Sequence, residues 1–205
     1  KASSPINLYG ATKLCSDKLF VAANSYSGDT GTKFSVVRYG NVMGSRGSVI
    51  PFFMSLDKKE TVPITDLRMT RFMISLDQGI NLVTQAFEDM IGGEIYVKKI
   101  PSMKIEDVAA CVCPDQKITE VGIRPGEKLH EQMIGVEDAM TTYEYEDYFK
   151  ILPEINHWSS DPDRIKDGSK VDGDFTYSSN LNKDWMSRQE LMNWIAENKD
   201  KLLTI

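Results

Sequence analysis

Three long stretches of the chain carry helical signals. They are residues 5–25, 76–90 and 187–201. The middle stretch has apolar residues every three or four positions, which places them on one face of a helix. The first stretch opens with Pro5, a residue suited to a first helical turn, and continues in good helix formers. The last begins at Ser187 with Glu190 three residues later, which predicts a capping box.

Short apolar runs between these stretches predict strands and shorter helices. Such runs, bounded by glycine, proline or polar residues, are typical of strands. The predicted strands are 34–39, 62–64, 94–97, 117–121, 141–146 and 148–152. We expect the last two to pair with each other. The predicted shorter helices are 50–56, with Pro51 in its first turn, and 105–113, together with a helical turn at 129–134.

The remaining segments are predicted as turns and loops. Glycine marks a turn at 28–33 and a loop at 41–48. From Pro153 to Asp174 the composition becomes rich in Asp, Ser, Pro, Gly and Asn. Residues of these types favour turns, so we expect 153–174 to be a surface loop.

Size and charge limit the classes of function. A chain of 205 residues can hold one domain with a sizeable core, or one and a half. Its net charge of −6 argues against nonspecific binding to nucleic acid, although it permits a local basic pocket. No apolar run approaches the roughly 18–20 residues of a membrane span. We therefore expect neither a membrane-spanning segment nor a signal peptide.

Cysteine and histidine residues give no metal-binding pattern. The three cysteines, Cys15, Cys111 and Cys113, lack ligand spacing and are interpreted as ordinary thiols of a reducing cytoplasm. His130 and His157 lie far apart, and neither has cysteine or acidic companions at ligand spacing. We therefore expect no metal site.

Tyr9 and Lys13 are the first candidates for catalysis. They are four residues apart on a predicted helix, so they lie one turn apart on the same face. An ammonium group beside a phenol favours the phenolate, which makes Tyr9 a candidate general base for oxidising an alcohol. The same spacing is also common on solvated helix faces. The pair alone therefore leaves both interpretations open.

The motifs around this pair resemble a known family. The run Pro5-x-Asn7-x-Tyr9-Gly-x-Thr-Lys13, followed by Arg38-Tyr-Gly-Asn-Val42, is similar to the catalytic helix and following strand of the extended short-chain dehydrogenases/reductases. More narrowly, the chain up to about Tyr177 resembles the inverting UDP-N-acetylglucosamine 4,6-dehydratases. Those enzymes begin pseudaminic acid synthesis for flagellin glycosylation. The specific marks are Lys1 and the segments 63–72, 99–104 and 122–131.

The resemblance implies an α/β fold, the C-terminal part of an NAD(P)-binding Rossmann-like enzyme with its smaller substrate-binding region. It assigns 1–48 to the end of the Rossmann-like domain with the catalytic helix. It assigns 49–152 to a substrate-binding region interleaved with returning Rossmann elements, and 153–205 to a C-terminal loop and helix.

The glycine turn of dinucleotide-binding enzymes is missing from the sequence. No Gly-x-Gly-x-x-Gly occurs, although a dinucleotide pyrophosphate normally rests on such a turn. In the family this turn lies upstream of the catalytic helix. We therefore expect the chain to be the C-terminal part of a longer enzyme, which alone binds its cofactor poorly and is inactive.

The resemblance also implies a reaction, the NADP-dependent 4,6-dehydration of UDP-N-acetylglucosamine with inversion at carbon 5. Tyr9 takes the hydroxyl proton at carbon 4 while hydride passes to NADP, and Lys13 holds the nicotinamide ribose. The family has a Thr-Asp-Lys triplet, of which only Lys1 is present here. Lys1 is implied to help remove the carbon 5 proton and expel water from carbon 6. Tyr39 and Val42 are the further implied cofactor contacts.

Substrate contacts are implied on later segments. Asn41 is expected to contact the diphosphate or sugar, and Glu127 the ribose hydroxyls of uridine. Arg71 and Arg124 suit the pyrophosphate, because a guanidinium fork matches phosphate oxygens in a bidentate way. The full implied set is Asn41, Arg46, Gly47, Ser48, Val49, Ile50, Thr65, Arg71, Arg124 and Glu127.

Two alternatives accompany this interpretation. A UDP-sugar 4-epimerase of the same superfamily would share Tyr9, Lys13 and the nucleotide contacts, but it would need no amine at Lys1. An inactive nucleotide-sugar-binding module is motivated by the missing glycine turn. The resemblance further implies a cytoplasmic homo-oligomer, without a membrane or nucleic-acid partner.

Overall fold

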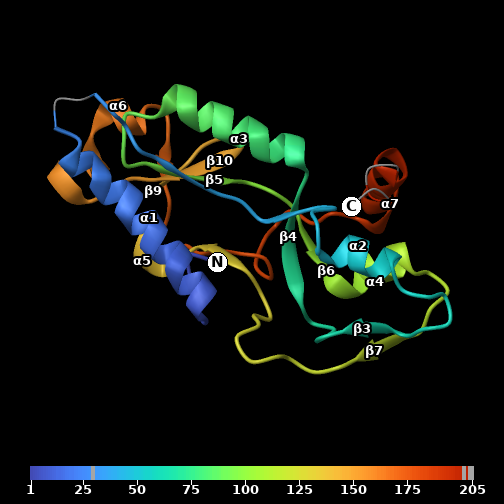
Figure 1. Ribbon diagram of the computed structural model, residues 1–205. Coiled ribbons are helices and arrows are strands. Elements are labelled where there is room, and N and C mark those ends of the chain that lie inside the picture. Colours follow the sequence, from blue (N-terminus) through green and yellow to red (C-terminus); the bar gives the residue numbers. More distant parts are fainter. Residues whose placement is uncertain (29–30, 200–201, 203–205) are drawn as a thin grey trace. The chain divides into compact units, whose positions relative to one another are not determined.

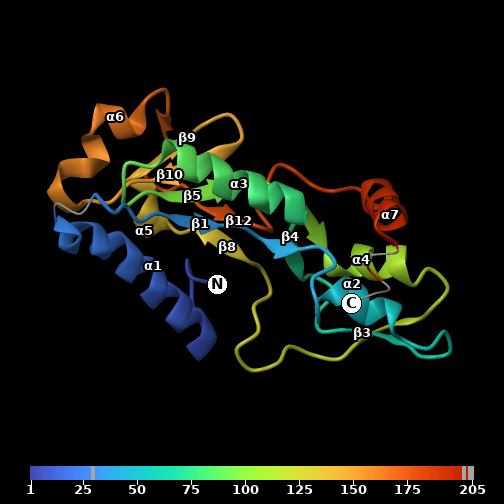
Figure 2. The same ribbon diagram turned by 45° about the horizontal axis from the view of Figure 1, so that its top comes forward.

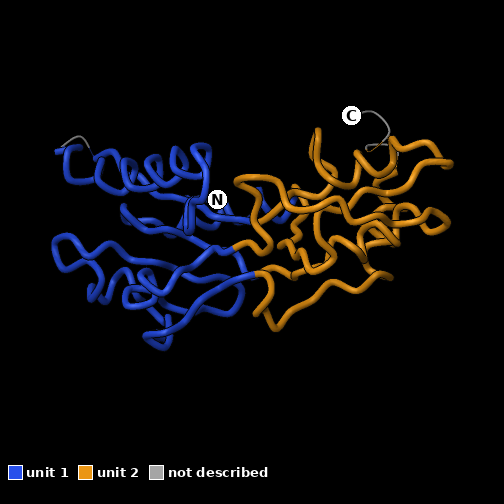
Figure 3. Tube along the Cα trace, turned by 90° about the horizontal axis from the view of Figure 1, so that it is seen from below, with its two compact units in different colours: residues 1–39, 77–99, 132–178 blue, residues 40–76, 100–131, 179–205 orange. Residues whose placement is uncertain are grey.

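The fold is known from a computed structural model that describes residues 1–28, 31–199 and 202. The chain divides into two compact units, coloured separately in Figure 3. Unit 1 comprises 1–39, 77–99 and 132–178, and unit 2 comprises 40–76, 100–131 and 179–205. Each unit is therefore assembled from three separate stretches of sequence. The three-part division at 1–48, 49–152 and 153–205 stays a prediction.

Unit 1 is built on a five-stranded sheet with a long helix on each face. The strands are β1 (Val36–Arg38), β5 (Ile95–Lys98), β9 (Thr142–Glu144), β10 (Tyr148–Ile151) and β11 (Ser169–Lys170). Their order is β1-β5-β10-β9-β11, with β1 parallel to β5 and the other pairs antiparallel. Helices α1 (Leu8–Tyr26, blue) and α3 (Leu76–Asp89, green) cover opposite faces (Figures 1 and 2).

Smaller elements complete unit 1. They are β8 (Gln132–Ile134), α5 (Val136–Ala139), the 3-10 helix η2 (Ile155–Ser160), α6 (Pro162–Ile165) and β12 (Tyr177–Ser178). Strands β8 and β12 pair antiparallel as a separate two-stranded sheet. On the face of the five-stranded sheet that α3 covers, Leu82 and Ala86 of α3 pack against Tyr96 of β5. Burying such side chains stabilises a fold by about 1.5–3 kcal/mol each for the larger ones.

A buried arginine fastens α1 to the sheet. Arg38, the last residue of β1, donates from Nε to Asp17 of α1 at 2.8 Å. Its Nη1 donates to the Met133 carbonyl oxygen of β8 and to the Asp138 carboxylate of α5, both at 2.9 Å. Because Asp17 is buried, loss of Arg38 would leave its carboxylate as an unpaired charge in the interior. This network fixes the helix that carries Tyr9.

The part of unit 2 that the structure describes contains two small sheets and several helices. The strands β2 (Asn41–Val42), β4 (Thr70–Ile74) and β6 (Ser102–Lys104) form one sheet, and β3 (Val62–Ile64) pairs in parallel with β7 (Ile118–Glu120). The helices are α2 (Val49–Met54), α4 (Ile105–Val112) and α7 (Arg188–Glu197).

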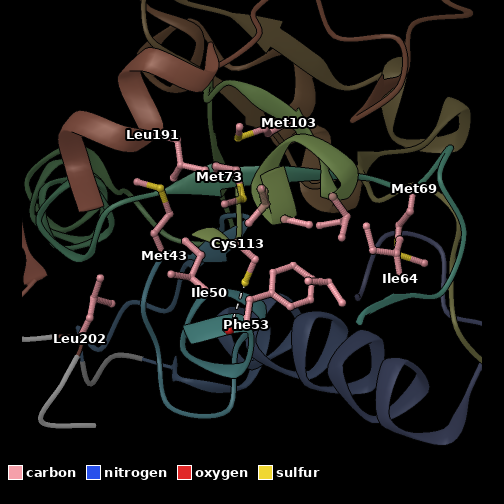
Figure 4. Packing of buried hydrophobic residues seen from close by; sticks show 14 residues of the cluster. Met43, Ile50, Phe53, Ile64, Met69, Met73, Met103, Cys113, Leu191 and Leu202 are labelled. Carbon is pink, nitrogen blue, oxygen red and sulfur yellow. Dashed lines mark hydrogen bonds between the residues drawn. The ribbon is translucent and has the colours of Figure 1, made fainter. Parts of the chain in front are cut away.

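The core of unit 2 is rich in methionine (Figure 4). Met73 of β4 and Met103 of β6 are buried there with Phe53 of α2 and Leu191 of α7. Methionine is flexible and fills irregular gaps between small sheets and short helices. The Cys113 thiol donates to the Phe53 carbonyl oxygen at 3.3 Å, so this cysteine belongs to the core.

The predicted α/β class and the three long helices are confirmed, with shifts at the helix ends. Helix α1 begins at Leu8, so Pro5 precedes it, and Asn7 is the N-cap. The capping box before α7 is present. The predicted end of that helix at Lys201 lies outside the described residues, as do positions 29 and 30 of the predicted turn at 28–33.

Several strand and loop predictions need correction. Residues 132–134 form β8 and not part of a helical turn, because pairing with β12 holds them extended. The predicted loop at 41–48 begins with β2, and β4 was not predicted at all. The predicted loop at 153–174 contains η2, α6 and β11, and its Arg164 is buried in an ion pair with Glu94. Its polar composition reflects these internal contacts as well as exposure to solvent.

Within the described ranges, no helix combines the length and the apolar character that crossing a membrane requires.

Candidate functional site

The three predicted catalytic residues gather at the start of α1. Tyr9 is 56% exposed. The Lys13 ammonium nitrogen lies 5.6 Å from the centroid of its ring, and the Lys1 ammonium nitrogen lies 5.2 Å from the same centroid. Two ammonium groups therefore lie close to the ring of one exposed phenol. The arrangement is therefore suited to accepting a proton from a bound alcohol.

Local packing explains how Lys1 reaches Tyr9. Asn7 Oδ1 accepts a hydrogen bond from Gly10 N at 2.8 Å and so fixes the first turn of α1. Gly10 also has the preceding segment against its face. A Cβ atom there would lie 3.1 Å from Pro5 Cβ and 3.2 Å from the Lys1 carbonyl oxygen. The glycine thus lets residues 1–5 fold back onto the helix.

The residues present fit one end of a nicotinamide dinucleotide. Lys13 is exposed, with its ammonium beside the Tyr9 ring, and can donate hydrogen bonds to ribose hydroxyls. Tyr39, another predicted cofactor contact of unit 1, is also exposed. The sequence carries no glycine turn for the pyrophosphate. The fit therefore extends to the nicotinamide ribose and not to the diphosphate.

A cavity of about 780 Å³ lies in unit 2 and collects most of the predicted ligand contacts. Because β3 and β7 are parallel, the residues that follow their carboxyl ends meet at one edge. Thr65 follows β3, and the segment with Arg124 and Glu127 follows β7. The predicted residues that line this unit 2 cavity are Asn41, Val42, Gly47, Ser48, Val49, Ile50, Thr65, Arg71, Arg124 and Glu127.

The apolar wall of the unit 2 cavity was missed in the sequence. Its members include Met43, Phe52, Pro63, Ile64, Met69, Met73, Ile105 and Val121. Apolar residues at such positions have the same spacing as core residues, so no local signal marks them as lining. One predicted contact is absent from the lining: Arg46 is exposed and lies outside the set of residues that line the cavity.

The Glu127 carboxylate is oriented by two donors. Thr65 Oγ1 donates to Glu127 Oε1 at 3.2 Å, and the Arg124 backbone N–H donates to Glu127 Oε2 at 3.3 Å. The turn closes with a hydrogen bond from Glu127 N to the Arg124 carbonyl oxygen at 3.0 Å. Gly126 has a φ of +78°, which suits glycine in this turn. A fixed carboxylate can accept hydrogen bonds from a pair of ligand hydroxyls.

Arg71 uses its guanidinium mainly within the protein. Nη1 donates to the carbonyl oxygens of Thr70 at 2.7 Å and Leu129 at 3.0 Å, and Nη2 donates to that of Lys128 at 2.9 Å. Nε lies 3.7 Å from Glu131 Oε1. Burial lowers the pKa of Arg71, and the nearby Glu131 carboxylate opposes that shift.

Ser48 also lines the unit 2 cavity. It is the N-cap residue of α2, but its side chain makes no capping hydrogen bond. Its Oγ is buried and has no hydrogen-bond partner among the described residues. A buried hydroxyl without a partner is costly, so a ligand oxygen in the cavity would relieve it.

Metal-binding groups of three or more His, Cys, Asp or Glu residues do not occur in the described part of the chain. His130 instead joins a hydroxyl pair in unit 2: its Nδ1 lies 2.8 Å from Thr70 Oγ1, which lies 2.7 Å from Ser179 Oγ. Burial lowers the pKa of His130, and the charges of Arg71 and Arg68 lower it further. The neutral imidazole is therefore favoured as partner of the Thr70 hydroxyl.

Curated relatives include two kinds of nucleotide-sugar enzyme. The chain is 52% identical over 199 residues to a UDP-N-acetylglucosamine 4,6-dehydratase (inverting) of Campylobacter jejuni, a match that covers 94% of this chain and 60% of the relative. It is 38% identical over 156 residues to a UDP-glucose 4-epimerase of Rickettsia canadensis, which covers 74% of this chain and 46% of the relative. The predicted resemblance to the inverting dehydratases is thereby confirmed.

A solved structure supports the fold. The structure of Pen from Bacillus thuringiensis matches 97% of this chain and 60% of its own, with a TM-score of 0.83 and 33% identity. This likeness confirms the predicted Rossmann-like fold class. The chain spans 60% of the length of the Campylobacter relative as well. A family described as polysaccharide biosynthesis protein matches residues 1–153, most of the chain, and the chain therefore belongs to this family.

Proposed function

We propose that the chain supplies the proton-transfer residues and the nucleotide-sugar pocket of a nicotinamide-dependent UDP-N-acetylglucosamine 4,6-dehydratase that inverts carbon 5. The observation that carries the proposal is that the ammonium groups of Lys1 and Lys13 both lie close to the exposed ring of Tyr9. Lys13 and Tyr9 suffice for oxidising an alcohol. The additional amine of Lys1 suits an elimination.

The first step is oxidation at carbon 4. The Tyr9 phenolate takes the proton of the carbon 4 hydroxyl, and the Lys13 ammonium stabilises the phenolate and donates to the ribose hydroxyls of the cofactor. When bound, a nicotinamide would serve as the acceptor of the hydride that leaves carbon 4 and as the donor of the hydride that carbon 6 receives. The ketone formed at carbon 4 makes the proton on carbon 5 more acidic.

The second step is loss of water. The proton on carbon 5 leaves, a double bond forms between carbons 5 and 6, and the carbon 6 hydroxyl departs as water. Lys1 lies next to Tyr9 and can assist both the loss of the proton and the departure of the hydroxyl. Hydride addition at carbon 6 and protonation of carbon 5 on the opposite face complete the reaction. Water is the only net loss, and no net oxidation occurs.

The unit 2 cavity is proposed to hold the UDP part of the substrate. Its volume of about 780 Å³ lies within the range of known small-molecule sites, roughly 300–1,000 Å³. Glu127 accepts hydrogen bonds from the ribose hydroxyls, and Arg124 faces the diphosphate. The unpartnered hydroxyl of Ser48 and the side chain of Asn41 contact phosphate or sugar oxygens.

Finer assignments rest on the resemblance alone. They are NADP as the cofactor, a homo-oligomeric enzyme in the cytoplasm, and a place at the start of pseudaminic acid synthesis for flagellin glycosylation. The UDP-sugar 4-epimerase is the second candidate, because a curated relative carries that name. An epimerase has no elimination step, so it leaves Lys1 without a role.

Replacing Lys1 separates the two candidates. In the natural polypeptide that carries this sequence, supplied with NADP and UDP-N-acetylglucosamine, Lys1→Ala is expected to abolish the carbon 6 methyl signal in proton NMR. Oxidation at carbon 4, followed as a transient rise in NADPH absorbance, should persist. Normal dehydration by Lys1→Ala would contradict the assigned role of Lys1. Calorimetric titration of the wild type with UDP and UDP-N-acetylglucosamine tests the pocket, and absence of heat from both would refute it.

A further inference from the structure

Arg71 lies in the wall of the unit 2 cavity but faces the protein. It is the second residue of β4, and its side chain is 11% exposed. A guanidinium has five N–H groups. Three of them donate to the main-chain carbonyl oxygens of Thr70, Lys128 and Leu129, and Nε is directed toward Glu131. Little donor capacity is left for the bidentate grip that recognition of a diphosphate uses.

Apart from the Thr70 carbonyl oxygen, the acceptors of Arg71 belong to one short segment, residues 128–131. Thr70 N donates to the Leu129 carbonyl oxygen at 3.1 Å, and Thr70 Oγ1 bonds to His130. The start of β4 therefore binds residues 128–131 through the main chain of Thr70 and through the adjacent side chains of Thr70 and Arg71. The turn that ends at Glu127 immediately precedes residues 128–131.

We propose that Arg71 is a positioning residue, which anchors residues 128–131 to β4 and thereby holds the Glu127 carboxylate in place for the ribose. The inference rests on the proposed function of the cavity as a UDP site. It leaves the diphosphate to Arg124, an exposed arginine that lines the same cavity.

The two possible roles of Arg71 differ in the ligands that they affect. An anchor for Glu127 acts on the ribose, which uridine and UDP share, so its loss weakens both ligands by the same factor. A phosphate ligand acts on UDP alone, so its loss leaves uridine binding unchanged. A residue with a purely structural role would lower the melting temperature without changing either dissociation constant.

The test compares Arg71→Lys with two matched variants. Arg68→Lys is the control, because Arg68 lies just before β4, its side chain is 74% exposed and bonds to Asp66, and it is not among the residues that line the cavity. Arg124→Gln is the reference for a lost phosphate contact. Dissociation constants for uridine and UDP are measured by titration. We expect Arg71→Lys to weaken both ligands on the order of tenfold, Arg124→Gln to weaken UDP selectively, and Arg68→Lys to weaken neither.

Selective loss of UDP binding by Arg71→Lys, or no loss of either ligand, overturns the positioning role. If Arg71→Lys folds poorly, Glu131→Gln removes the ion pair only and should weaken both ligands by one smaller, common factor. A wild-type chain that binds neither ligand refutes the UDP site instead.

Hydrogen exchange tests the anchor without any ligand. In the ligand-free chain, Arg71→Lys is expected to speed exchange of the Thr70 and Glu131 amides, which bond to the Leu129 carbonyl oxygen and the Ser179 hydroxyl. Arg68→Lys should leave these rates unchanged. Unchanged exchange in Arg71→Lys overturns the anchor, even if no nucleotide binds.

Discussion

Asp89 illustrates how charged side chains of unit 1 are paired with ammonium groups and hydrogen-bond donors. Lys150 Nζ lies 2.6 Å from its carboxylate, the Tyr96 hydroxyl donates to it at 2.7 Å, and Lys166 pairs with its other oxygen. Lys150 is only 1% exposed, so its ammonium depends on this carboxylate. Burial tends to raise the pKa of Asp89, but the hydrogen bonds from Lys150, Lys166 and Tyr96 outweigh it and lower the pKa to about 2.

Asp89 should therefore make stability depend on acid pH. Its folded pKa of about 2 lies below the ordinary value of 3.8, so its contribution is present above pH 3.8 and is lost as the pH falls toward 2. The size of the shift corresponds to about 2 kcal/mol. Asp89→Asn is expected to unfold at a lower urea concentration than wild type at pH 7, and the gap should narrow between pH 4 and pH 2. A gap independent of pH would contradict this.

Single residues differ in how far the sequence reveals their roles. The approach of Lys13 to the Tyr9 ring is predictable, because their spacing is local, and their proposed roles come from a specific motif. Lys1 is found only through the resemblance, and its approach to Tyr9 depends on Gly10. The proposed role of Arg71 could not be predicted, because its acceptors Lys128 and Leu129 lie almost sixty residues further along the chain, at separations of 57 and 58. An arginine in a family motif is therefore easily interpreted as a ligand contact even when its hydrogen bonds are made to other parts of the protein.

At the scale of elements, the junction between β1 and β2 depends on Gly40. A Cβ atom at this position would lie 2.5 Å from Phe72 Cβ and 2.6 Å from the Phe72 carbonyl oxygen in β4. Strand β2 begins at the next residue, and it carries Asn41 and Val42 into the cavity wall. The close approach of two strands therefore leaves no room for a side chain.

Gly40→Ala is expected to destabilise the fold. Forcing a methyl group into this contact should cost about 1–3 kcal/mol, because the main chain of β4 has to move. Gly79→Ala in α3 is the matched control, since an added Cβ there meets no atom within 4 Å. Alanine in a helix interior should gain up to about 1 kcal/mol. Urea unfolding of both variants measures the difference, and equal effects would contradict the packing at Gly40.

The long helices that the sequence revealed owe little to distant partners. Helix α3 has its own apolar face, and α7 has its own capping box. The missed or wrong elements depend on pairing instead. Strand β4 lies between β2 and β6, and β8 is held extended by β12 far along the chain. Similarly, the polar composition of 153–174 gave no sign that Arg164 would be buried against Glu94.

At the scale of the molecule, the candidate groups are divided between the units. Tyr9 belongs to unit 1, whereas all residues that line the 780 Å³ cavity belong to unit 2. The sequence predicted Tyr9 and the polar residues of the lining such as Thr65 and Glu127, because they occur in motifs, but it missed the apolar wall. It did not predict the division, because each unit is assembled from separated stretches.

Tyr9→Phe should therefore separate turnover from binding. Loss of the phenol oxygen removes the base, so dehydration by the natural polypeptide should fall on the order of a hundredfold or more. UDP affinity, measured by calorimetry, should stay within about twofold, because no UDP contact is removed. Tyr26→Phe is the matched control at the other end of α1, where the ring is 87% exposed. Unchanged turnover in Tyr9→Phe would refute its role as base.

The alternation of the chain between the two units also affects how the protein folds during its synthesis. Six successive segments belong by turns to unit 1 and unit 2, and β1 must wait for β5 before its parallel pairing can form. Contacts between distant segments slow folding, because long loops must close first. During synthesis, unit 1 is complete only when residue 178 has emerged from the ribosome, and unit 2 only later. Until then both cores expose apolar surface, so the nascent chain should depend on chaperones more than a protein with consecutive domains.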